Sequence, residues 1–282
     1  MDAFETIKRR KSIRTYQDRP VEEEVLNRIK ALMEEFREGP FGNQVRFELL
    51  DLGALDSQEM RRLGTYGIIK GARWYLLGAV KEGKDHKDHK DHMEDLGYSM
   101  ERIILEITAM GLGTCWLGGT FRRGSFANQM NLSRDELLPA ISPVGYPANE
   151  NSFANRMVKL AAGSHGRKPW QELFFGPDGN TPLVKSQERK LARALEAVRL
   201  APSAVNRQPW RVIKGSDGCC HFYLKENFFN LGKMSLQNLD MGIAMCHFHL
   251  VAQQDGLPGR WQKDAAAPQI KGLDYRATWV PA

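Results

Sequence analysis

The chain has 282 residues, of which 42% are hydrophobic and 26% charged, and its formal net charge is +6. This size and balance are typical of a soluble globular protein with one large domain or two ordinary ones. The mean hydropathy of −0.46 argues against a membrane span, and the first residues lack the apolar segment of a signal peptide, so we expect a cytoplasmic protein. Four cysteines without metal-ligand spacing fit reduced thiols.

Helical and strand-like patterns alternate along the chain. We predict helices over 20–37, 56–63, 94–110, 133–139, 186–200 and 238–255. Short apolar runs predict strands over 45–52, 73–80, 210–214, 221–225 and 276–280. Helices with a few strands in each half of the chain favour an α+β fold built in layers.

The chain contains an internal repeat. Two sets of residues recur at identical spacing: Asp95-Leu96-Gly97, Gly111-Leu112 and Trp116, and then Asp240-Met241-Gly242, Gly256-Leu257 and Trp261. A helical stripe before a proline also occurs twice, at Ile29, Met33 and Phe36 before Pro40 and at Leu191, Leu195 and Val198 before Pro202. We predict two similar halves, 1–160 and, with a Gly- and Pro-rich linker, 161–282. Coincidence between ordinary amphipathic helices is the alternative.

The segment RRKSIRTY, residues 9–16, predicts an anion site within a basic cluster. In an extended segment alternate side chains share a face, which places Arg10, Ser12 and Arg14 together, with Lys11 opposite. Two guanidinium groups beside a hydroxyl can hold a phosphate by charge-assisted hydrogen bonds. A solvated basic tail is the alternative. Because no nucleic-acid-binding motif accompanies the cluster, we expect a small anionic partner and neither nucleic acid nor membrane.

Three further segments present backbone or polar groups. GLGTCWLGGTF (111–121) turns through Gly118-Gly119, where backbone N–H groups can approach a flat ligand, although a helix cap and loop have the same pattern. RKPW (167–170) is a basic pair that by default is solvated. LAPSAVNRQPW (200–210) follows a helix stop and presents Ser203, Asn206 and Gln208; an ordinary helix-to-strand connection is the alternative.

The histidine-rich run KDHKDHKDH (84–92) is interpreted as a solvated surface segment. His86, His89 and His92 would drift around a helix by about 60° per step, so they do not share one face. We predict no metal site. His247 and His249 are interpreted as packing or pairing groups, and Phe228-Phe229 as an apolar pair in a surface loop.

Together, RRKSIRTY, GLGTCWLGG with GYP (145–147), RKPW and LAPSAVNRQPW resemble the FMN-dependent nitroreductase family, and most closely its tandem-fused "putative nitroreductase" subgroup. The resemblance covers most of the chain. It implies a nitroreductase-like FMN-binding fold in which two similar halves form an intrachain pseudo-dimer, since ordinary members are homodimers with flavin at the subunit interface. The late Ala-Pro-Ser motif would then be the contribution of the fused partner.

The resemblance also implies which residues bind the cofactor. One FMN would lie between the halves, held on one side by Arg10, Lys11, Ser12, Arg14, Leu117, Gly118, Gly119 and Arg167, and on the other by Pro202, Ser203, Ala204, Asn206 and Gln208. Backbone N–H groups of Gly118 or Gly119 would lie near flavin N5. Arg167 or Lys168 would face its N1/O2 edge.

Three departures from the family pattern predict that the symmetry-related site is lost. EGPFGNQVRF (38–47) keeps Pro40, Asn43 and Gln44 but lacks the serine, PLVKSQERK (182–190) lacks Arg-x-Ser-x-Arg, and WQKD (261–264) replaces Trp-Leu-Gly-Gly. We therefore expect a single FMN per chain, with the twin site empty or filled by side chains. A fused pair of halves further predicts a monomer or a weak homodimer.

The activity that the resemblance implies is an NAD(P)H-dependent oxidoreductase with ping-pong turnover. NAD(P)H would donate a hydride to flavin N5 and leave, and a nitroaromatic, quinone or similar acceptor would then take the electrons. No side chain is expected to act as a catalytic acid, base or nucleophile. A non-catalytic flavin-binding protein and a flavin enzyme of dehalogenating or dehydrogenating type are the alternatives.

Overall fold

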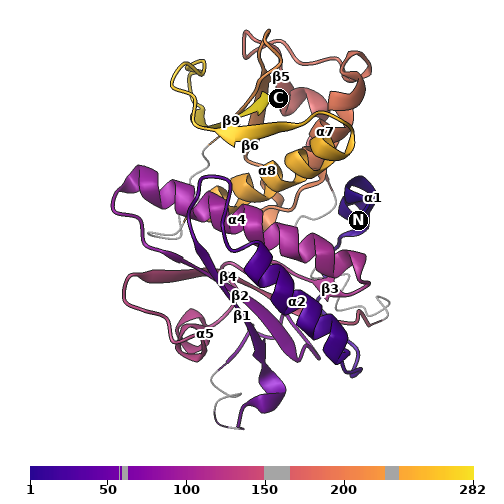
Figure 1. Ribbon diagram of the computed structural model, residues 1–282, viewed down its shortest axis with the longest axis vertical. Coiled ribbons are helices and arrows are strands. Elements are labelled where there is room, and N and C mark those ends of the chain that lie inside the picture. The colour runs from indigo at the N-terminus through magenta and orange to yellow at the C-terminus, as the bar shows by residue number, and fades with distance from the viewer. Residues whose placement is uncertain (57, 59–62, 149–165, 226–234) are drawn as a thin grey trace.

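The computed structural model describes all residues except 57, 59–62, 149–165 and 226–234. The N-terminal part, residues 1–148, contains a four-stranded sheet, and the C-terminal part, residues 166–282, contains a five-stranded sheet. Two long helices, α4 (His86–Ala109) and α8 (Leu236–Gln254), lie against each other between the sheets (Figure 1). This layered mixture of helices and sheets confirms the predicted α+β class.

The other elements follow one another in chain order. In the N-terminal part they are α1 (Ala3–Arg9), α2 (Glu23–Glu35), β1 (Val45–Asp51), η1 (Leu52–Ala54), β2 (Trp74–Lys81), β3 (Gly113–Thr114), α5 (Arg123–Gln129) and β4 (Glu136–Gly145). In the C-terminal part they are η2 (Trp170–Glu172), β5 (Phe174–Phe175), η3 (Lys185–Gln187), α7 (Arg189–Leu200), η4 (Ala204–Asn206), β6 (Trp210–Lys214), β7 (Cys220–Leu224), β8 (Gly259–Gln262) and β9 (Asp274–Pro281).

The N-terminal sheet has the antiparallel order β1-β2-β4-β3 and is covered on both faces. Alternate residues of β2 point to opposite faces, so Leu76 joins the core under α2 and α4, while Tyr75 and Leu77 join the core with Phe126 of α5. The apolar stripe of α2 inserts Ile29 into the first of these cores. The edge strand β3 lies beside β4 and leaves room for the N-terminal segment described below.

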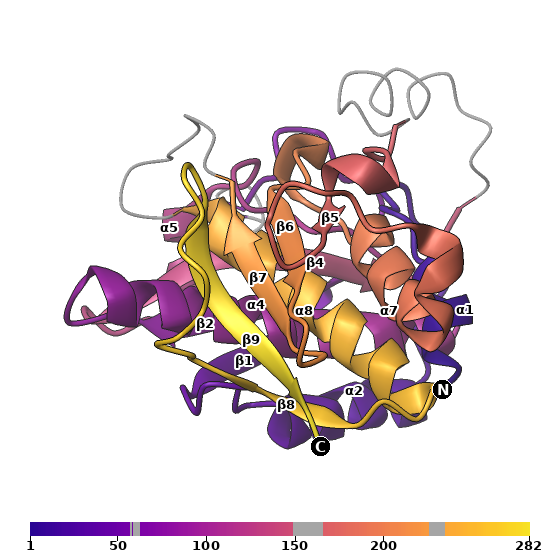
Figure 2. The same ribbon diagram turned by 90° about the horizontal axis from the view of Figure 1, so that it is seen from above.

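The C-terminal sheet has the order β5-β6-β7-β9-β8, with only the β5–β6 pair parallel. Helices α7 and α8 pack on it (Figure 2). Its core is rich in aromatic rings, among them Phe222, Phe248, Trp261 and Trp279, and the last two meet edge-on at 5.2 Å between centroids. Edge-on contacts of this kind are a favourable way for rings to fill a core.

The α4–α8 contact depends on two glycines from the internal repeat. A Cβ atom on Gly97 would lie 2.2 Å from Leu239 O, and one on Gly242 would lie 2.0 Å from Glu94 O. Each helix therefore approaches the backbone of the other closely, which a larger residue would prevent. The contact is reciprocal, because the glycine of each helix faces the residue that lies three positions before the glycine of the other.

Helix α1 belongs to the C-terminal core although it begins the chain. Ala3 and Ile7 are buried in the same cluster as α7 and α8, and the Ala3 N–H donates to Gln254 Oε1 at 2.7 Å. Both views place α1 beside α7 (Figures 1 and 2). The chain then returns to the N-terminal part after Arg10, so residue 10 lies where the two parts meet.

Most of the predicted elements are present. The five predicted strands correspond to β1, β2, β6, β7 and β9, with small shifts at their ends, and four predicted helices correspond to α2, α4, α7 and α8. Helix α4 begins at His86, well before residue 94, because Asp85 caps it by accepting a hydrogen bond from the Asp88 N–H. Most of the predicted helix 56–63 and the Phe228-Phe229 pair lie outside the described residues.

The helix predicted over 133–139 is wrong, because this segment is a turn that leads into β4. The Ser133 N–H and hydroxyl donate to Glu136 Oε2, as in a helix cap, but the chain then extends between β2 and β3. The apolar run in β4 is buried on both faces, which favours a strand over an amphipathic helix. Pro139 lies where the β2–β4 register shifts, so its missing N–H breaks no regular pair.

The histidine-rich run forms the start of α4 and is partly engaged with the C-terminal part. Lys90 Nζ lies 2.7 Å from Asp274 Oδ2, and Asp91 Oδ1 lies 2.6 Å from Lys263 Nζ. The run is therefore less solvated than predicted. In the part of the chain that the structure describes, no group of three or more His, Cys, Asp or Glu side chains has the arrangement of a metal site. None of the described helices is both long and apolar enough to cross a bilayer.

Candidate functional site

Arg10 is buried at the junction of the two parts of the chain. Its backbone N–H closes α1 by donating to Thr6 O at 2.9 Å, and only 9% of the residue is exposed. Its Nε lies 3.9 Å from Oε1 of the buried Glu101, beyond hydrogen-bonding distance. Among the described residues, Nε and Nη1 of Arg10 have no hydrogen-bond partner. Buried N–H groups of this kind are costly without an acceptor, and they fit a phosphate that binds from outside the chain.

The segment after Arg10 is extended, as predicted. Ser12 pairs with Thr114 of β3, where the Ile13 N–H donates to Thr114 O at 2.8 Å. Burial raises the pKa of the neighbouring Cys115 thiol, and Arg14, Ser12 and Arg10 each oppose that rise. The three predicted residues therefore gather around one thiol, while Lys11 is exposed.

The glycine loop joins this segment to the C-terminal part. Leu117 exchanges both backbone hydrogen bonds with Ile141 of β4, which fixes the start of the loop. A Cβ atom on Gly118 would lie 2.7 Å from a methyl carbon of Leu236, the first residue of α8. Gly118 is half-buried and Gly119 is exposed, so the loop presents backbone at the junction.

Arg167 connects the basic segment with the serine–asparagine corner, residues 202–208. Its guanidinium donates to Leu200 O at 2.8 Å, to Ala201 O at 2.7 Å and to Asn206 Oδ1 at 3.2 Å. These contacts cap the C-terminus of α7. Burial, and next the charge of Arg10, lower the pKa of Arg167 to about 10. Two cations from distant parts of the sequence thus lie near each other.

The corner is held mainly by its own side chains. Asn206 Nδ2 donates to Gly166 O at 2.8 Å, and Gln208 Oε1 accepts from the Lys168 N–H at 2.8 Å. Gln208 is almost fully buried, so its amide holds the 166–168 segment in place. The Ser203 hydroxyl accepts from the Gln208 N–H at 2.9 Å and keeps its own proton to donate.

The corner also contains unusual backbone. Val205, Asn206 and Gln208 have φ values of 43°, 55° and 49°. A left-handed conformation is unfavourable for a β-branched residue, and Val205 is 62% exposed, so its own packing does not explain the conformation. Unusual backbone of this kind is frequent at functional sites, which makes this corner a candidate for a function.

A buried network lies behind Arg10. Glu101 of α4 is fully buried; its Oε2 accepts from Trp116 Nε1 at 2.6 Å, and its Oε1 lies 2.8 Å from His247 Nε2. His247 Nδ1 lies 3.0 Å from Ala197 O of α7. The interpretation of His247 and His249 as pairing groups is confirmed, since His249 Nδ1 contacts the Tyr98 hydroxyl at 2.5 Å.

Comparison with known proteins decides the family. The family profile described as "Putative TM nitroreductase" matches residues 2–252, most of the chain.

The chain belongs to the nitroreductase family.

It therefore falls in a class of oxidoreductases. The crystal structure of a "putative nitroreductase" from Thermotoga maritima MSB8 covers 99% of this chain and 92% of its own, with a TM-score of 0.62 and 21% identity. This likeness confirms the fold.

Shorter nitroreductase structures match part of the chain. A nitroreductase family protein from Clostridium difficile 630 covers 61% of this chain and 96% of its own, with 19% identity and a TM-score of 0.46. An FMN-dependent nitroreductase from Clostridium difficile R20291 covers 54% of this chain and 90% of its own, with 20% identity and a TM-score of 0.40. No curated protein sequence matches this chain.

The chain contains a different cluster where Pro40–Asn43 meets the WQKD segment. Lys263 Nζ lies 3.9 Å from the centre of the Phe41 ring, 2.6 Å from Asp91 Oδ1 and 3.1 Å from Glu94 Oε2. Arg276 pairs with Glu94, and Lys90 pairs with Asp274. In these ion pairs the positive and negative charges balance, unlike those around Arg10. The segments that were predicted to lack the serine and the glycines of the second site therefore contain a cluster in which the charges pair with one another.

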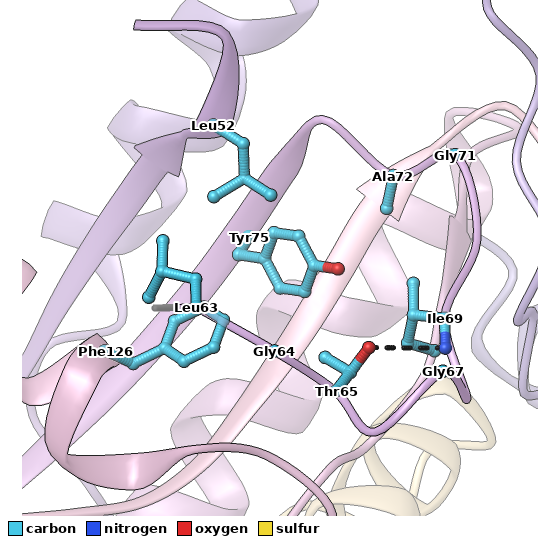
Figure 3. A pocket seen from close by; sticks show the side chains of 10 residues that line it. All are labelled: Leu52, Leu63, Gly64, Thr65, Gly67, Ile69, Gly71, Ala72, Tyr75 and Phe126. Carbon is cyan, nitrogen blue, oxygen red and sulfur yellow. Dashed lines mark hydrogen bonds between the residues drawn. The ribbon is translucent and has the colours of Figure 1, made fainter. Parts of the chain in front are cut away.

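A cavity in the N-terminal part differs in character from the Arg10 region. Its volume is about 300 Å³, and Figure 3 shows the Tyr75 ring between Leu52, Leu63 and Phe126. Thr65 Oγ1 there accepts from the Ile69 N–H at 3.3 Å. Burial raises the pKa of Tyr75 to about 12, so its phenol is neutral. The lining residues carry no cation and include none of the predicted site residues, so this cavity is not suited to a phosphate.

Two aspartates of the internal repeat, to which the sequence analysis assigned no role in the site, hold loops of the chain. Asp95 accepts from the Phe41 N–H, the Asn43 N–H and Asn43 Nδ2. Asp240 accepts from the Ala204 N–H at 3.0 Å, and its Oδ2 has no partner among the described residues. Burial raises the pKa of Asp95 to about 7 and that of Asp240 to about 8. The matched positions of Asp95 and Asp240 in the internal repeat were the sequence signal that could have identified them. No comparable sequence signal identified Glu101.

Asp240→Asn is expected to stabilise the protein at pH 8, whereas Asp95→Asn destabilises it. The raised pKa of Asp240 means that the folded state binds its proton more tightly, so this stabilisation is complete below the unfolded pKa and is lost as pH rises through about 8. An amide keeps the Ala204 hydrogen bond without ionising, and should raise the free energy of unfolding by about 2 kcal/mol at pH 8.

Position 95 is the matched control. An amide NH₂ there would face a donor and lower the free energy of unfolding by about 2 kcal/mol. Urea unfolding of both variants between pH 5 and 8 measures these changes in the free energy of unfolding and their dependence on pH. Equal losses of stability in the two variants would contradict this account of Asp240.

Proposed function

We propose that the chain is an FMN-dependent NAD(P)H oxidoreductase that reduces flat acceptors such as nitroaromatics or quinones. The family membership supports an oxidoreductase, and an FMN-dependent nitroreductase is among the structures that resemble this chain. The observation that carries the proposal is Arg10, whose buried and unpartnered nitrogens lie at the junction of the predicted segments. One phosphate group could accept hydrogen bonds from both of these nitrogens.

FMN, when bound, would supply the redox chemistry, and the protein would bind and orient it. Arg10 would donate to the phosphate, with Arg167 adding positive charge nearby. Ser12 and Arg14 would complete the anion site. Backbone N–H groups at Gly118 and Gly119 would hydrogen-bond the ring near N5, and a positive charge from Lys168 would favour the reduced, anionic flavin.

The corner would act partly through Arg167. Because the Asn206 amide is bound by Arg167, Gly166 and Gln208, we propose that it positions the guanidinium as well as the backbone of residues 202–206. The apolar and hydroxyl-bearing walls of the proposed FMN site would be formed by Pro202, Ser203, Ala204 and Leu117. The exposed Val205 would lie over the ligand.

The two parts would function as a pseudo-dimer formed by an internal duplication. The reciprocal contacts of Gly97 and Gly242 support this proposal, as does the repeat in sequence. The self-paired cluster around Lys263 supports a single flavin site, since it leaves no excess of positive charge for a second phosphate. Both sides of the site would come from one chain, so a monomer would suffice.

Val205→Gly is expected to stabilise the flavin-free protein while weakening FMN binding. Glycine adopts the left-handed conformation readily, which should relieve strain and raise the free energy of unfolding by about 1 kcal/mol after its entropic cost. Loss of the exposed apolar side chain should weaken FMN binding by about fivefold. Thermal melting and flavin titration measure the two effects, and a less stable variant would show that the fold itself requires valine.

Anaerobic addition of NADH or NADPH to the FMN-loaded protein tests the proposed activity. We expect rapid loss of the flavin absorbance near its visible maximum, followed by its return when a nitroaromatic or quinone is added. FMN binding with no loss of absorbance would instead indicate a flavin-binding protein without reductase activity. Reduction by NAD(P)H with no return on adding these acceptors would indicate another reaction type.

A further inference from the structure

The proton positions around His247 follow from its partners. The carbonyl of Ala197 can only accept, so the hydrogen bond at 3.0 Å requires a proton on His247 Nδ1. The contact between His247 Nε2 and Glu101 Oε1 at 2.8 Å requires one further proton, on either the ring or the carboxyl group. Both arrangements leave the His247–Glu101 pair with zero net charge.

The zero net charge of the His247–Glu101 pair determines the electrostatic environment of the Arg10 guanidinium. Glu101 Oε1 lies 3.9 Å from Arg10 Nε, so an isolated carboxylate there would cancel the charge of the guanidinium. Because His247 balances Glu101, the positive charge of Arg10 is not cancelled by the network. Its Nε and Nη1 lack partners among the described side chains, as a group held for an outside anion would.

The network beside Arg10 joins elements from both parts of the chain. Glu101 lies on α4, Trp116 follows β3, and His247 lies on α8 and reaches α7 through Ala197. Both Glu101 and His247 are fully buried, so neither can contact a ligand from solvent. Any effect they have on binding must pass through Arg10 or the packing of the helices.

We propose that His247 neutralises the buried carboxyl group of Glu101, so that the charge of Arg10, whose Nε lies 3.9 Å from that carboxyl group, stays available to the phosphate of the ligand. This inference rests on the proposed FMN site. It makes binding of the phosphate by the N-terminal part dependent on a histidine from the C-terminal part. Charge balance, rather than the presence of either side chain alone, is the property that matters.

Three variants separate charge balance from packing. His247→Gln keeps a donor toward Glu101 but removes the positive charge, so the carboxylate would compete with the phosphate for Arg10. Glu101→Gln leaves a neutral pair, because its amide can donate to the neutral ring. The double variant, Glu101→Gln with His247→Gln, is also neutral and can keep a hydrogen bond between the two amides.

The measurement is the dissociation constant of FMN and of riboflavin, which lacks the phosphate, for each variant. We expect His247→Gln to weaken FMN binding by about 30-fold and to leave riboflavin binding within about threefold of the unmodified protein. Glu101→Gln and the double variant should bind FMN within about threefold of the unmodified protein. Recovery in the double variant is the outcome that a packing defect does not predict.

The outcomes distinguish this inference from the proposed function. Failure of the unmodified protein to bind FMN would overturn both. Tight FMN binding by the unmodified protein, together with an unchanged ratio of FMN to riboflavin affinity in His247→Gln or a double variant weaker than either single one, would overturn only the role of the pair. If His247→Gln does not fold, the ¹⁵N shifts of His247 in the unmodified protein decide: a protonated Nδ1 is expected, and a bare Nδ1 would refute the assignment.

Discussion

Gly242→Ala is expected to lower the free energy of unfolding by about 3 kcal/mol, the largest stability loss that we predict for a single methyl group. The added Cβ would lie 2.0 Å from Glu94 O and 2.7 Å from the Tyr98 N of α4. Both atoms belong to a helix backbone, so no side-chain rotation can relieve the contact. The helices would have to separate along the layer that joins the two parts.

Gly124→Ala is the matched control for this substitution. Gly124 lies in α5, and a Cβ there would have no neighbour within 4 Å, so alanine should be neutral or stabilising by up to about 1 kcal/mol. Urea unfolding gives both values. Similar stabilities for Gly242→Ala and Gly124→Ala would show that α4 and α8 do not pack as closely as the structure places them.

Arg10→Ala should produce the largest loss of ligand binding, weakening FMN by about 100-fold. Two charge-assisted hydrogen bonds to the phosphate would be lost, and each contributes about 1.5–3 kcal/mol. The flavin-free variant should be no less stable than the unmodified protein, since the substitution removes two unpartnered buried nitrogens and a cation beside Arg167. Fluorescence titration and melting with and without FMN measure the two quantities.

Arg9→Ala provides the control for net charge. Arg9 precedes Arg10 and is exposed, so its removal changes the charge of the protein equally without touching the buried site. Its FMN affinity should stay within about threefold of the unmodified protein. An equal loss in the two variants would assign the effect to long-range charge, and unchanged binding in Arg10→Ala would exclude Arg10 as a phosphate ligand.

The elements of the candidate site could be predicted from the sequence where local pattern and backbone agree. Alternation in RRKSIRTY placed Arg10, Ser12 and Arg14 on one side of an extended segment, and the structure brings all three near Cys115. Likewise, Pro202 ended a helix and Trp210 began a strand. These features depend on neighbours in the chain, which the sequence displays directly.

Features that depend on distant contacts were not predicted. Helix α1 packs into the C-terminal core, and Glu101 is one of several charged residues in α4 until His247 and Trp116 are brought beside it. Strand β4 was missed because its two-sided burial gives a continuous apolar run with prolines, which has no strand periodicity. In each case tertiary packing, absent from local pattern, decides the outcome.

Titration of the flavin-free protein with FMN, followed by absorbance and by mass analysis of the bound pigment, tests the central claim most directly. We expect saturation at a single FMN per chain in a monomer, with riboflavin bound far more weakly because Arg10 and Arg167 act on the phosphate. Saturation at two FMN per chain, equal affinity for riboflavin and FMN, or no binding at all would contradict it.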